Sequence, residues 1–321
     1  MIPKPLIFEN NKLFILDQRK LPFKEIYIEV KSAYQMSNLI KNMAIRGAPL
    51  IAIASSYAIL IEAMKKNNKE KLLKSIEILK NSRPTAVNLF NTLKEIEKII
   101  LNSKNLQEEL FKLVINLDKE EKEKCLKIAQ NGLKIFKKKS SVLTYCNTGF
   151  LATTGIGTAL GIIYRAFENN LIEKVIVPET RPYLQGSRLT IYELEKLKIP
   201  YELITDNSIA FIMSKGEVDL AIVGADRVLS DGTLINKIGT LNIAILCNYY
   251  KIPFWTAFPT STIDKSSKLE EVIIEKRNKD EVIKFKNFLI TIENANVINY
   301  AFDITPKHLI TGYITENGII N

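Results

Sequence analysis

Four short groups of polar residues follow short apolar runs, and their side chains are the ones in this sequence best suited to acid–base chemistry. They are Cys146-Asn147, Glu179-Thr180-Arg181, Asp206-Asn207 and Asp226-Arg227. In an open α/β sheet, ligands bind beyond the carboxyl ends of the strands. If the apolar runs are parallel strands, a thiol, carboxylates and arginine side chains meet at one edge of the sheet. The sequence therefore predicts a reaction site at that edge.

Two of these side chains stand out. Cys146 ends an apolar run and precedes an expected helix, whose dipole would favour a thiolate; the alternative is a small, buried apolar side chain. Asp226 follows the apolar run 218–224. A carboxylate partly removed from water is suited to passing a proton. The alternative for Asp226 is a turn cap or an ion pair with Arg227.

Three further segments are suited to binding an anion. Arg46-Gly47-Ala48-Pro49 leads into an apolar helical stretch. Proline is common at a first helical position, where the backbone N–H groups are unpaired and attract anions. Arg83-Pro84 repeats the arrangement, and Asn236-Lys237 is expected to open a helix after Asp226. Salt bridges or helix caps are the alternatives in each case.

The elements that must position these groups alternate in the second half of the chain. Strand-length apolar runs alternate with helical patterns, which predicts a parallel, Rossmann-like sheet. The expected strands are 142–146, 175–178, 201–205, 220–224 and 254–258, and the helices are 155–168, 187–198, 208–214 and 237–250. The glycine-rich link 144–161 matches neither the Walker nor the dinucleotide fingerprint, so we expect no nucleotide cofactor.

The first half of the chain has a different sequence pattern and fewer glycines. Apolar runs around Glu9-Asn10-Asn11 predict a β-hairpin over 6–15. Apolar residues three and four apart predict helices at 31–43, 49–65, 69–80, 85–101, 106–117 and 119–138. Only Gly47 and Gly132, of 13 glycines, precede position 149. We therefore expect an α/β protein with a small, mainly helical N-terminal domain, residues 1–140, and a Rossmann-like domain, residues 141–321.

The composition excludes several classes of protein. Three cysteines without paired spacing and a single histidine, His308, give no zinc pattern, and unpaired thiols fit the cytoplasm. The stretch 49–64 falls short of the roughly 18–20 clean apolar residues of a membrane span, so we expect a buried helix there. The net charge of +10 comes from lysines interleaved with glutamate, without an aromatic platform for nucleic acid. A phosphorylated small molecule remains compatible with that charge.

Taken together, the motifs resemble those of the methylthioribose-1-phosphate isomerase family, in order and over nearly the whole chain. The matching segments are Leu16–Gln18, Ala44–Ala54, Ser82–Asn88, Cys146–Gly161, Glu179–Arg188, Val223–Arg227, Asn236–Thr240, Pro259–Asp264 and Ala301–Pro306. The resemblance implies a homodimer that needs no metal and no cofactor. It also implies conversion of 5-methylthioribose 1-phosphate into 5-methylthioribulose 1-phosphate, a step of methionine salvage.

The resemblance assigns roles to nine residues. It implies that Cys146 and Asp226 are the catalytic pair. It implies that the substrate contacts are Arg46, Gly47, Ala48, Arg83, Gln185, Asn236 and Lys237. Whether Cys146 takes the C2 proton or stabilises charge during a hydride shift stays open at this point.

Related proteins supply the alternatives. Isomerases of 5-deoxyribose 1-phosphate and ribose 1,5-bisphosphate share the fold and the catalytic pair, whereas regulatory subunits of translation initiation factor 2B share the fold as binding modules. The segments Cys146–Gly149 and Arg83–Asn88 favour an isomerase. Tyr145, Pro178 and Glu275–Arg277 depart from the family pattern, which leaves the C5 substituent of the sugar open. Phe150 and Leu151, beside Cys146, are expected to suit a methylthio or methyl end.

Overall fold

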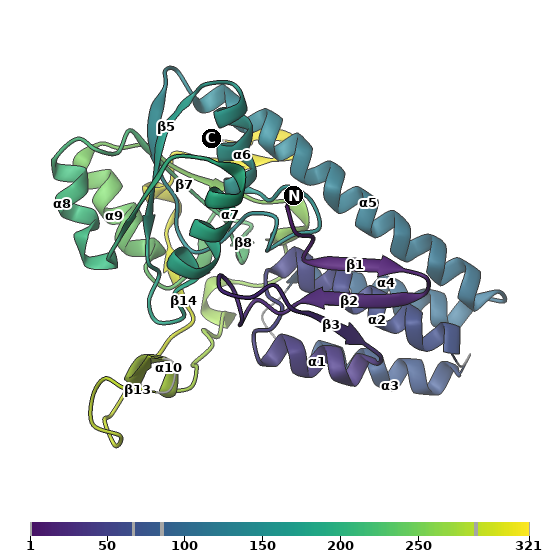
Figure 1. The fold of residues 1–321 in the computed structure, drawn as a ribbon. Helices are drawn as coiled ribbons and strands as arrows, with labels where there is room; N and C mark the ends of the chain where they lie inside the picture. The colour runs from purple at the N-terminus through teal and green to yellow at the C-terminus, as the bar shows by residue number, and fades with distance from the viewer. Residues whose placement is uncertain (1, 66–67, 84–86, 286–287, 321) are drawn as a thin grey trace.

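The N-terminal region combines a small antiparallel sheet with a group of helices (Figure 1). The computed structural model describes residues 2–65, 68–83, 87–285 and 288–320. Strands β1 (Leu6–Glu9) and β2 (Lys12–Leu16) form the expected hairpin. Asn10 and Asn11 have φ angles of 49° and 58°, as a two-residue type I′ turn requires. The third strand, β3 (Tyr27–Val30), was not predicted.

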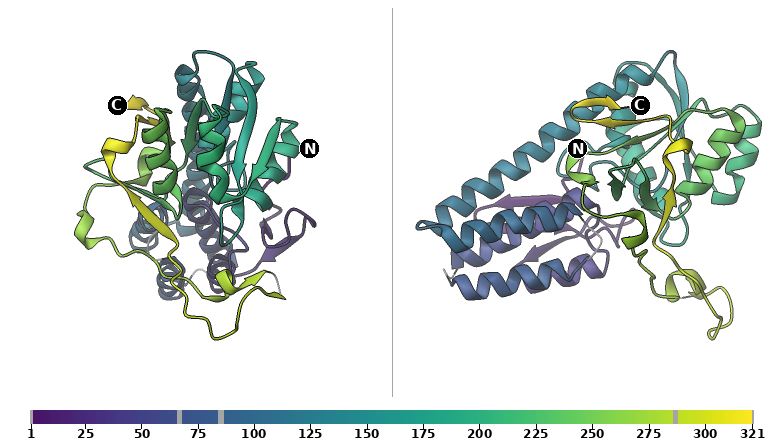
Figure 2. Two further views of the ribbon diagram at one scale, coloured as in Figure 1. Left: turned by 90° about the vertical axis from the view of Figure 1, so that its left-hand side faces the viewer. Right: turned by 180° about the vertical axis from the view of Figure 1, so that it is seen from behind.

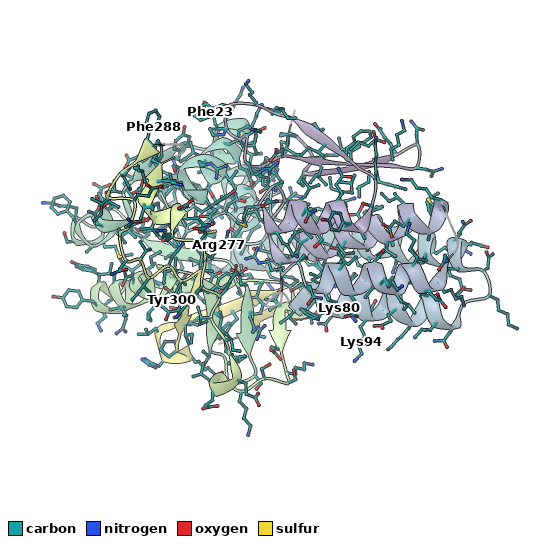
Figure 3. The ribbon with its side chains drawn as sticks, turned by 90° about the horizontal axis from the view of Figure 1, so that it is seen from below. Phe23, Lys80, Lys94, Arg277, Phe288 and Tyr300 are labelled. Atoms are coloured by element: carbon teal, nitrogen blue, oxygen red, sulfur yellow. The ribbon has the colours of Figure 1, made fainter. Side chains whose placement is uncertain are left out.

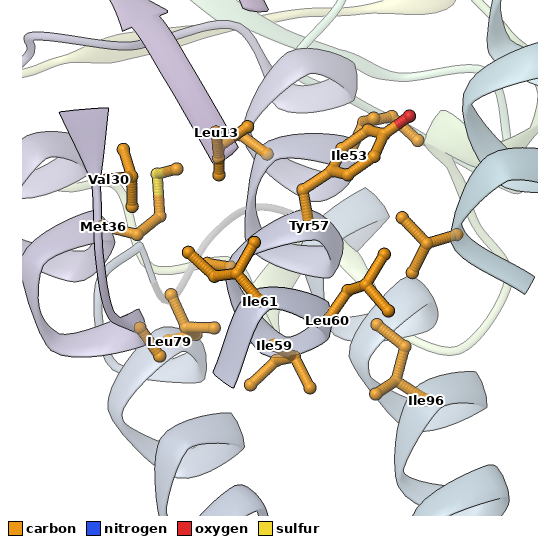
Figure 4. Packing of buried hydrophobic residues seen from close by; sticks show 14 of the residues in the cluster. Leu13, Val30, Met36, Ile53, Tyr57, Ile59, Leu60, Ile61, Leu79 and Ile96 are labelled. Carbon is orange, nitrogen blue, oxygen red and sulfur yellow. The ribbon is translucent and has the colours of Figure 1, made fainter. Parts of the chain in front are cut away.

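Helix α2 (Ala48–Lys65) is the centre of this half of the molecule. It is long and apolar enough to cross a membrane, but 83% of it is buried inside the protein, as expected for a core helix. Its Tyr57, Ile59, Leu60 and Ile61 lie in one apolar cluster with residues of the sheet and of the surrounding helices (Figure 4). Those helices are α1 (Ala33–Lys41), α3 (Lys69–Lys80), α4 (Val87–Asn102) and α5 (Leu106–Gly132).

Helix α5 corrects one expectation. The sequence predicts a break near Asp118, but the helix is continuous over 27 residues and packs on both α2 and α6. No proline or glycine interrupts it before Gly132. The Asp118 carboxylate accepts hydrogen bonds from Tyr57 (3.0 Å) and Lys122 (2.8 Å). One oxygen of this carboxylate is therefore hydrogen-bonded within a continuous helix, where the sequence pattern indicated a boundary.

The second half is a seven-stranded sheet with the Rossmann order of strands. Its order is β6-β5-β4-β7-β10-β15-β16, and every neighbouring pair is parallel except β15 and β16. The six parallel strands follow the order 3-2-1-4-5-6 of dinucleotide-binding folds, which reverses direction between the first and fourth strands. That switch point lies between β4 and β7. The strands are β4 (Ser140–Leu143), β5 (Ile172–Pro178), β6 (Tyr201–Ile204), β7 (Leu220–Val223), β10 (Phe254–Ala257), β15 (Gly312–Thr315) and β16 (Gly318–Ile320).

Helices connect these strands much as the alternating pattern predicts. The α-helices are α6 (Ala159–Glu168), α7 (Ile191–Leu197), α8 (Ile209–Ser214) and α9 (Thr240–Tyr250). The short helical turns are Leu133–Ile135, Gly186–Thr190, Asp206–Ser208, Thr260–Thr262, Leu269–Glu271 and Lys307–Leu309. The α/β fold, with its helical N-terminal region, is therefore confirmed.

A second, smaller sheet was not predicted. It has the order β11-β8-β9-β14, with β8 (Arg227–Leu229), β9 (Leu234–Lys237), β11 (Ile263–Asp264) and β14 (Phe302–Thr305). The expectation that Asn236-Lys237 opens a helix is therefore wrong, because both residues end β9 and α9 begins at Thr240. Gly239, at φ 103°, makes the turn between them; a Cβ there would lie 2.2 Å from the Tyr145 hydroxyl.

One segment projects from the body of the molecule, as Figures 1 and 2 show. It carries α10 (Asp280–Ile283) and the short antiparallel strands β12 (Lys284–Phe285) and β13 (Phe288–Leu289). The residues on either side of it, Arg277 and Tyr300, lead back to the small sheet and to the cavities described below.

Candidate active site

The two residues singled out for chemistry lie on either side of the switch point of the sheet. Cys146 follows β4, and Asp226 follows β7. Both line a cleft of about 470 Å³, open solvent at its mouth included. The start of α2 contributes Arg46, Gly47 and Ala48 to the same cleft, and β9 contributes Asn236. The cleft thus collects six of the nine predicted site residues.

Cys146 is held in an unusual backbone conformation. Its φ angle of 61° lies in the left-handed region, which costs a non-glycine residue about 1–2 kcal/mol. Its N–H donates to Thr180 Oγ1 (3.1 Å), and its carbonyl accepts from Thr190 Oγ1 (2.5 Å). Asp206 in turn accepts from the Thr180 N–H at 2.8 Å. Groups that follow β4, β5 and β6 therefore meet here, and together they hold the backbone of Cys146.

The glycine-rich link after Cys146 departs from the expectation in one respect. Helix α6 begins at Ala159, later than predicted, so a long loop separates Cys146 from the helix start. Thr158, the residue before the helix, still lines the cleft. The dipole of α6 therefore acts on the cleft, but Cys146 does not immediately precede it.

Arg46 is a buried cation tied to the Cys146 loop. Its guanidinium donates to the Asn147 carbonyl (2.9 Å) and to Asn147 Oδ1. Burial lowers the pKa of Arg46, and the nearby Cys146, Glu193 and Asp226 side chains oppose that shift. Among the described residues, its Nε atom has no hydrogen-bond partner. A buried donor left unpaired is costly, so an anion in the cleft would find it available.

Glu193, on α7, supports the same loop and was missed by the sequence analysis. Its carboxylate accepts from Asn147 Nδ2 (2.8 Å), the Phe150 N–H (2.8 Å) and the Leu151 N–H (3.0 Å). Burial raises the pKa of Glu193 to about 7. A glutamate inside a helical pattern carries no local sign of this role, since its partners lie more than 40 residues earlier in the chain.

Asp226 faces a cation rather than open water alone. Its Oδ1 atom lies 3.9 Å from the Arg83 guanidinium, and its side chain is 31% exposed. Arg227 lies 3.4 Å from Asp264. Residues 84–86, which follow Arg83 in its predicted anion-binding segment, lie outside the described residues.

A second cavity, of about 300 Å³, is lined by Arg83, whose guanidinium lies 3.9 Å from Asp226 of the cleft. It is also lined by Gln185 and Lys237, so it collects the remaining predicted residues. Gln185 is 1% exposed, and its Oε1 atom lacks a partner within the described part of the chain. Lys237 donates to the Ala301 carbonyl at 2.9 Å. Burial lowers the pKa of Lys237, and the positive charges of Arg83 and Arg277 add to this shift while Cys146 and Asp226 oppose it.

Arg277, which also lines this second cavity, is already neutralised. It lies near the middle of the view from below, where the helical and sheet halves of the molecule meet (Figure 3). Its guanidinium lies 2.9 Å from Glu275 and 2.5 Å from Glu281. It therefore differs from Lys237, for which the structure gives a carbonyl partner and no carboxylate among the described residues.

Phe150 and Leu151, which the sequence analysis expects at the C5 end of the sugar, lie away from the cleft. Both are buried in a separate apolar cluster with Leu16, Leu21, Leu189 and Tyr192, and neither lines the cleft. A largely apolar cavity of about 350 Å³ lies instead beside Arg83, Asp226 and Arg227; its apolar walls are Ile235, Val272, Ile273, Ile274 and Phe302. The sequence pattern missed this cavity because its walls come from the unpredicted small sheet and from the segment between its strands β11 and β14.

The other two cysteines and the single histidine lie away from the three cavities. Cys125 and Cys247 are buried, as expected of core residues, and His308 is exposed in a short helical turn. Among the described residues, no group of three or more His, Cys, Asp or Glu side chains could hold a metal ion.

Comparison with known proteins gives consistent matches. The family model described as the Initiation factor 2 subunit family matches residues 44–321. The chain is 44% identical to methylthioribose-1-phosphate isomerase of Carboxydothermus hydrogenoformans, over 98% of this chain and 95% of that protein. The crystal structure of 5-methylthioribose 1-phosphate isomerase from Pyrococcus horikoshii superimposes with a TM-score of 0.90 at 34% identity, covering 99% of this chain and 92% of that one. The translation initiation factor eIF-2B subunit delta of A. fulgidus gives a TM-score of 0.87 at 37% identity, covering 99% and 96%.

Proposed function

This chain belongs to the Initiation factor 2 subunit family, and we propose that it is an aldose–ketose isomerase that converts 5-methylthioribose 1-phosphate into 5-methylthioribulose 1-phosphate in methionine salvage. The observation that carries the proposal is the meeting of Cys146 and Asp226 in one cleft at the switch point of the sheet. Three cations from different segments of the chain, Arg46, Arg83 and Lys237, lie nearby. This combination suits a reaction that moves hydrogen on a phosphorylated sugar.

The proposed chemistry begins with the opening of the furanose ring. The C1 phosphate prevents the free aldehyde from forming, so the ring opens with the phosphoester in place. Asp226 donates a proton to the ring oxygen and later takes the proton of the C2 hydroxyl, which returns the carboxyl group to its starting state. The hydrogen on C2 moves to C1, and C2 becomes the carbonyl carbon.

Two routes for the C2 hydrogen remain in the proposal. In the first, Cys146 removes it as a proton and returns a proton to C1; in the second, it moves as a hydride and Cys146 stabilises the developing charge. Cys146 lies near enough to Arg46 and Lys237 to oppose the lowering of their pKa values by burial. Solvent deuterium at C1 of the product selects the first route, and complete retention of a C2 label selects the second.

We assign the binding of the substrate to the other predicted residues. Arg46, Arg83 and Lys237 supply positive charge for the phosphate, and the N-terminus of α2, at Gly47 and Ala48, adds a helix dipole. Gln185 and Asn236 supply amide groups for the sugar hydroxyls. The cleft lies between residues 1–140 and 141–321, which we treat as two domains of a cytoplasmic homodimer.

The C5 end of the sugar is assigned to the apolar cavity beside Asp226. A methylthio group suits walls made of Ile235, Val272 and Phe302. A second phosphate, as in ribose 1,5-bisphosphate, would need another cation. The arginines near the site already contact protein groups. Arg181 donates to the Val282 carbonyl, and Arg188 donates to the Gln18 carbonyl. Arg227 lies next to Asp264, and Arg277 lies next to two glutamates.

A regulatory binding module is the second candidate, because the chain also resembles an initiation factor 2B subunit. A module of that kind would bind a sugar phosphate without converting it. Incubation of the purified protein with 5-methylthioribose 1-phosphate, with the ketose product followed by NMR, separates the two. Product formed in proportion to enzyme supports the isomerase, and binding without turnover supports the module.

A further inference from the structure

We propose that Phe302 is a positioning residue for the phosphate of the substrate. Its ring holds the Arg83 guanidinium and the Lys237 ammonium group next to each other and leaves their N–H groups available to phosphate oxygens. This inference rests on the proposed function, in which these two cations bind the phosphate. Neither the motifs nor the catalytic pair assigns any role to Phe302.

The geometry places one aromatic ring against two cations. The Arg83 guanidinium carbon lies 5.6 Å from the centroid of the Phe302 ring, and Lys237 Nζ lies 4.9 Å from it. Both distances fall within the roughly 6 Å over which a ring attracts a cation. Phe302 is 3% exposed, so the attraction acts away from water.

The small sheet explains why the ring is there. Phe302 on β14 is the antiparallel partner of Lys237 on β9, and directly opposed residues place their side chains together on one face. The hydrogen bond from Lys237 Nζ to the Ala301 carbonyl, one residue before Phe302, fixes the ammonium group at the ring. Arg83 approaches the same ring from the segment before α4. The two cations come from distant parts of the chain, and Phe302 is their shared contact.

An aromatic ring suits this position better than a carboxylate. Buried Lys237 and partly buried Arg83 repel each other, as the lowering of the Lys237 pKa by Arg83 indicates after the larger effect of burial. A carboxylate between them would relieve the repulsion, but it would compete with the phosphate for their N–H groups. The ring attracts both charges and accepts no strong hydrogen bond. The cations are thus held ready for an anion that has still to arrive.

Phe302 also lines a cavity that shares Arg83 with the cavity of Lys237. Lys237 lines the polar cavity of about 300 Å³, Phe302 lines the apolar cavity of about 350 Å³ beside Asp226, and Arg83 lines both. A substrate that reaches both cavities, with a phosphate at one end and an apolar group at the other, would therefore contact the ring. The ring position fits a sugar phosphate that is apolar at C5.

The test compares Phe302→Leu with Leu229→Ala. Leucine replaces the ring by an aliphatic side chain. A second variant, Phe302→Met, provides the same test if Phe302→Leu folds poorly. Leu229 belongs to the same apolar cluster, with an exposed fraction of 3%, and no cavity described above is lined by it. Leu229→Ala therefore controls for lost packing. The measurements are KM and kcat for 5-methylthioribose 1-phosphate and the dissociation constant of inorganic phosphate by calorimetry.

The proposal expects a split between binding and turnover. In both Phe302 variants, KM and the phosphate dissociation constant rise about 3- to 30-fold, as loss of a buried cation–ring contact implies, and kcat stays within about twofold of wild type. Leu229→Ala changes none of the three. Equal effects in all variants, or a fall in kcat with unchanged KM, overturns the proposal. If the wild-type protein does not turn the sugar over, the proposed function fails, and the phosphate dissociation constants still decide the role of Phe302.

Discussion

The Arg83 guanidinium lies 3.9 Å from the Asp226 carboxylate, and this contact joins the catalytic cleft to the polar cavity that holds Lys237. A group that passes protons is thereby placed next to a group that binds phosphate. The C1 phosphate of an aldose and its ring oxygen are both attached to C1. Adjacent Asp226 and Arg83 side chains could therefore contact the ring oxygen and the phosphate at the same time.

Gly47 tests whether the start of α2 must approach the Cys146 loop closely. Its φ angle is 96°, and a Cβ would lie 2.4 Å from the Ala152 carbonyl oxygen. Gly47→Ala is expected to lower the free energy of unfolding by about 1–3 kcal/mol and to raise KM. Urea denaturation and steady-state kinetics measure the two effects. Gly216→Ala is the matched control, because Gly216 also has a positive φ, 71°, but no atom within 4 Å of the added Cβ. A similar rise in KM in both variants would contradict the assignment.

Buried carboxyl groups should make the protein less stable as the pH rises toward neutrality. Burial raises the pKa of Glu193 and of Glu121 to about 7, above their unfolded value of 4.5. Between pH 4.5 and 7 the folded state therefore binds more protons than the unfolded state, so the free energy of unfolding falls with increasing pH.

The matched variants Glu193→Gln and Glu121→Gln separate these contributions. In each, the fall in the free energy of unfolding across this pH range, measured by urea denaturation, should be smaller than in wild type. Only Glu193→Gln should also reduce kcat, because Glu193 holds the Cys146 loop through Asn147. An unchanged pH dependence in both variants would show that neither carboxyl group titrates in this range.

The apolar cavity beside Asp226 should set the preference for the C5 substituent. Ile235→Ala loosens one wall of that cavity, and we expect the ratio of kcat/KM for the methylthio sugar to that for the 5-deoxy sugar to fall about 3- to 10-fold. Phe150→Leu, in a cluster away from the cleft, should leave the ratio unchanged. The opposite pattern would restore the sequence-based expectation for Phe150.

Removal of metal ions should leave the activity intact. Proton transfer by Asp226 and charge stabilisation by arginine and lysine need no divalent cation. We expect kcat to be unchanged after exhaustive dialysis against a chelator. A loss of activity that added Mg²⁺ or Zn²⁺ restores would contradict the proposed mechanism.

Much of the fold follows from local patterns in the sequence. The Asn10-Asn11 turn, the buried helix α2 and the alternation that builds the parallel sheet each have short-range signals, and the structure confirms them. The polar residues after β4, β5 and β6 meet as the parallel sheet requires. The order of the strands, in contrast, depends on packing and could not be derived from one sequence.

The features that the sequence did not predict depend on partners far along the chain. Lys237 belongs to a strand because β9 pairs with β14, and its Nζ bonds a carbonyl 64 residues away. A run as short as Leu234–Lys237 carries too little periodicity to separate a strand from a helix start. Glu193 and Phe302 are similar, since a buried glutamate inside a helix and a phenylalanine inside a strand look like ordinary members of those elements.

The most direct test of the account is the turnover of 5-methylthioribose 1-phosphate by wild type, Cys146→Ser and Asp226→Asn. We predict that the wild-type protein forms the ketose and that each substitution lowers kcat by about 10²- to 10⁴-fold. The midpoint temperature of thermal unfolding of both variants should stay close to that of the wild type, because Asp226 is partly exposed and serine is nearly the size of cysteine. Cys247→Ala, which alters a buried thiol elsewhere, should keep its activity. A wild type without turnover, or either variant within a few-fold of the wild-type rate, would contradict the central claim.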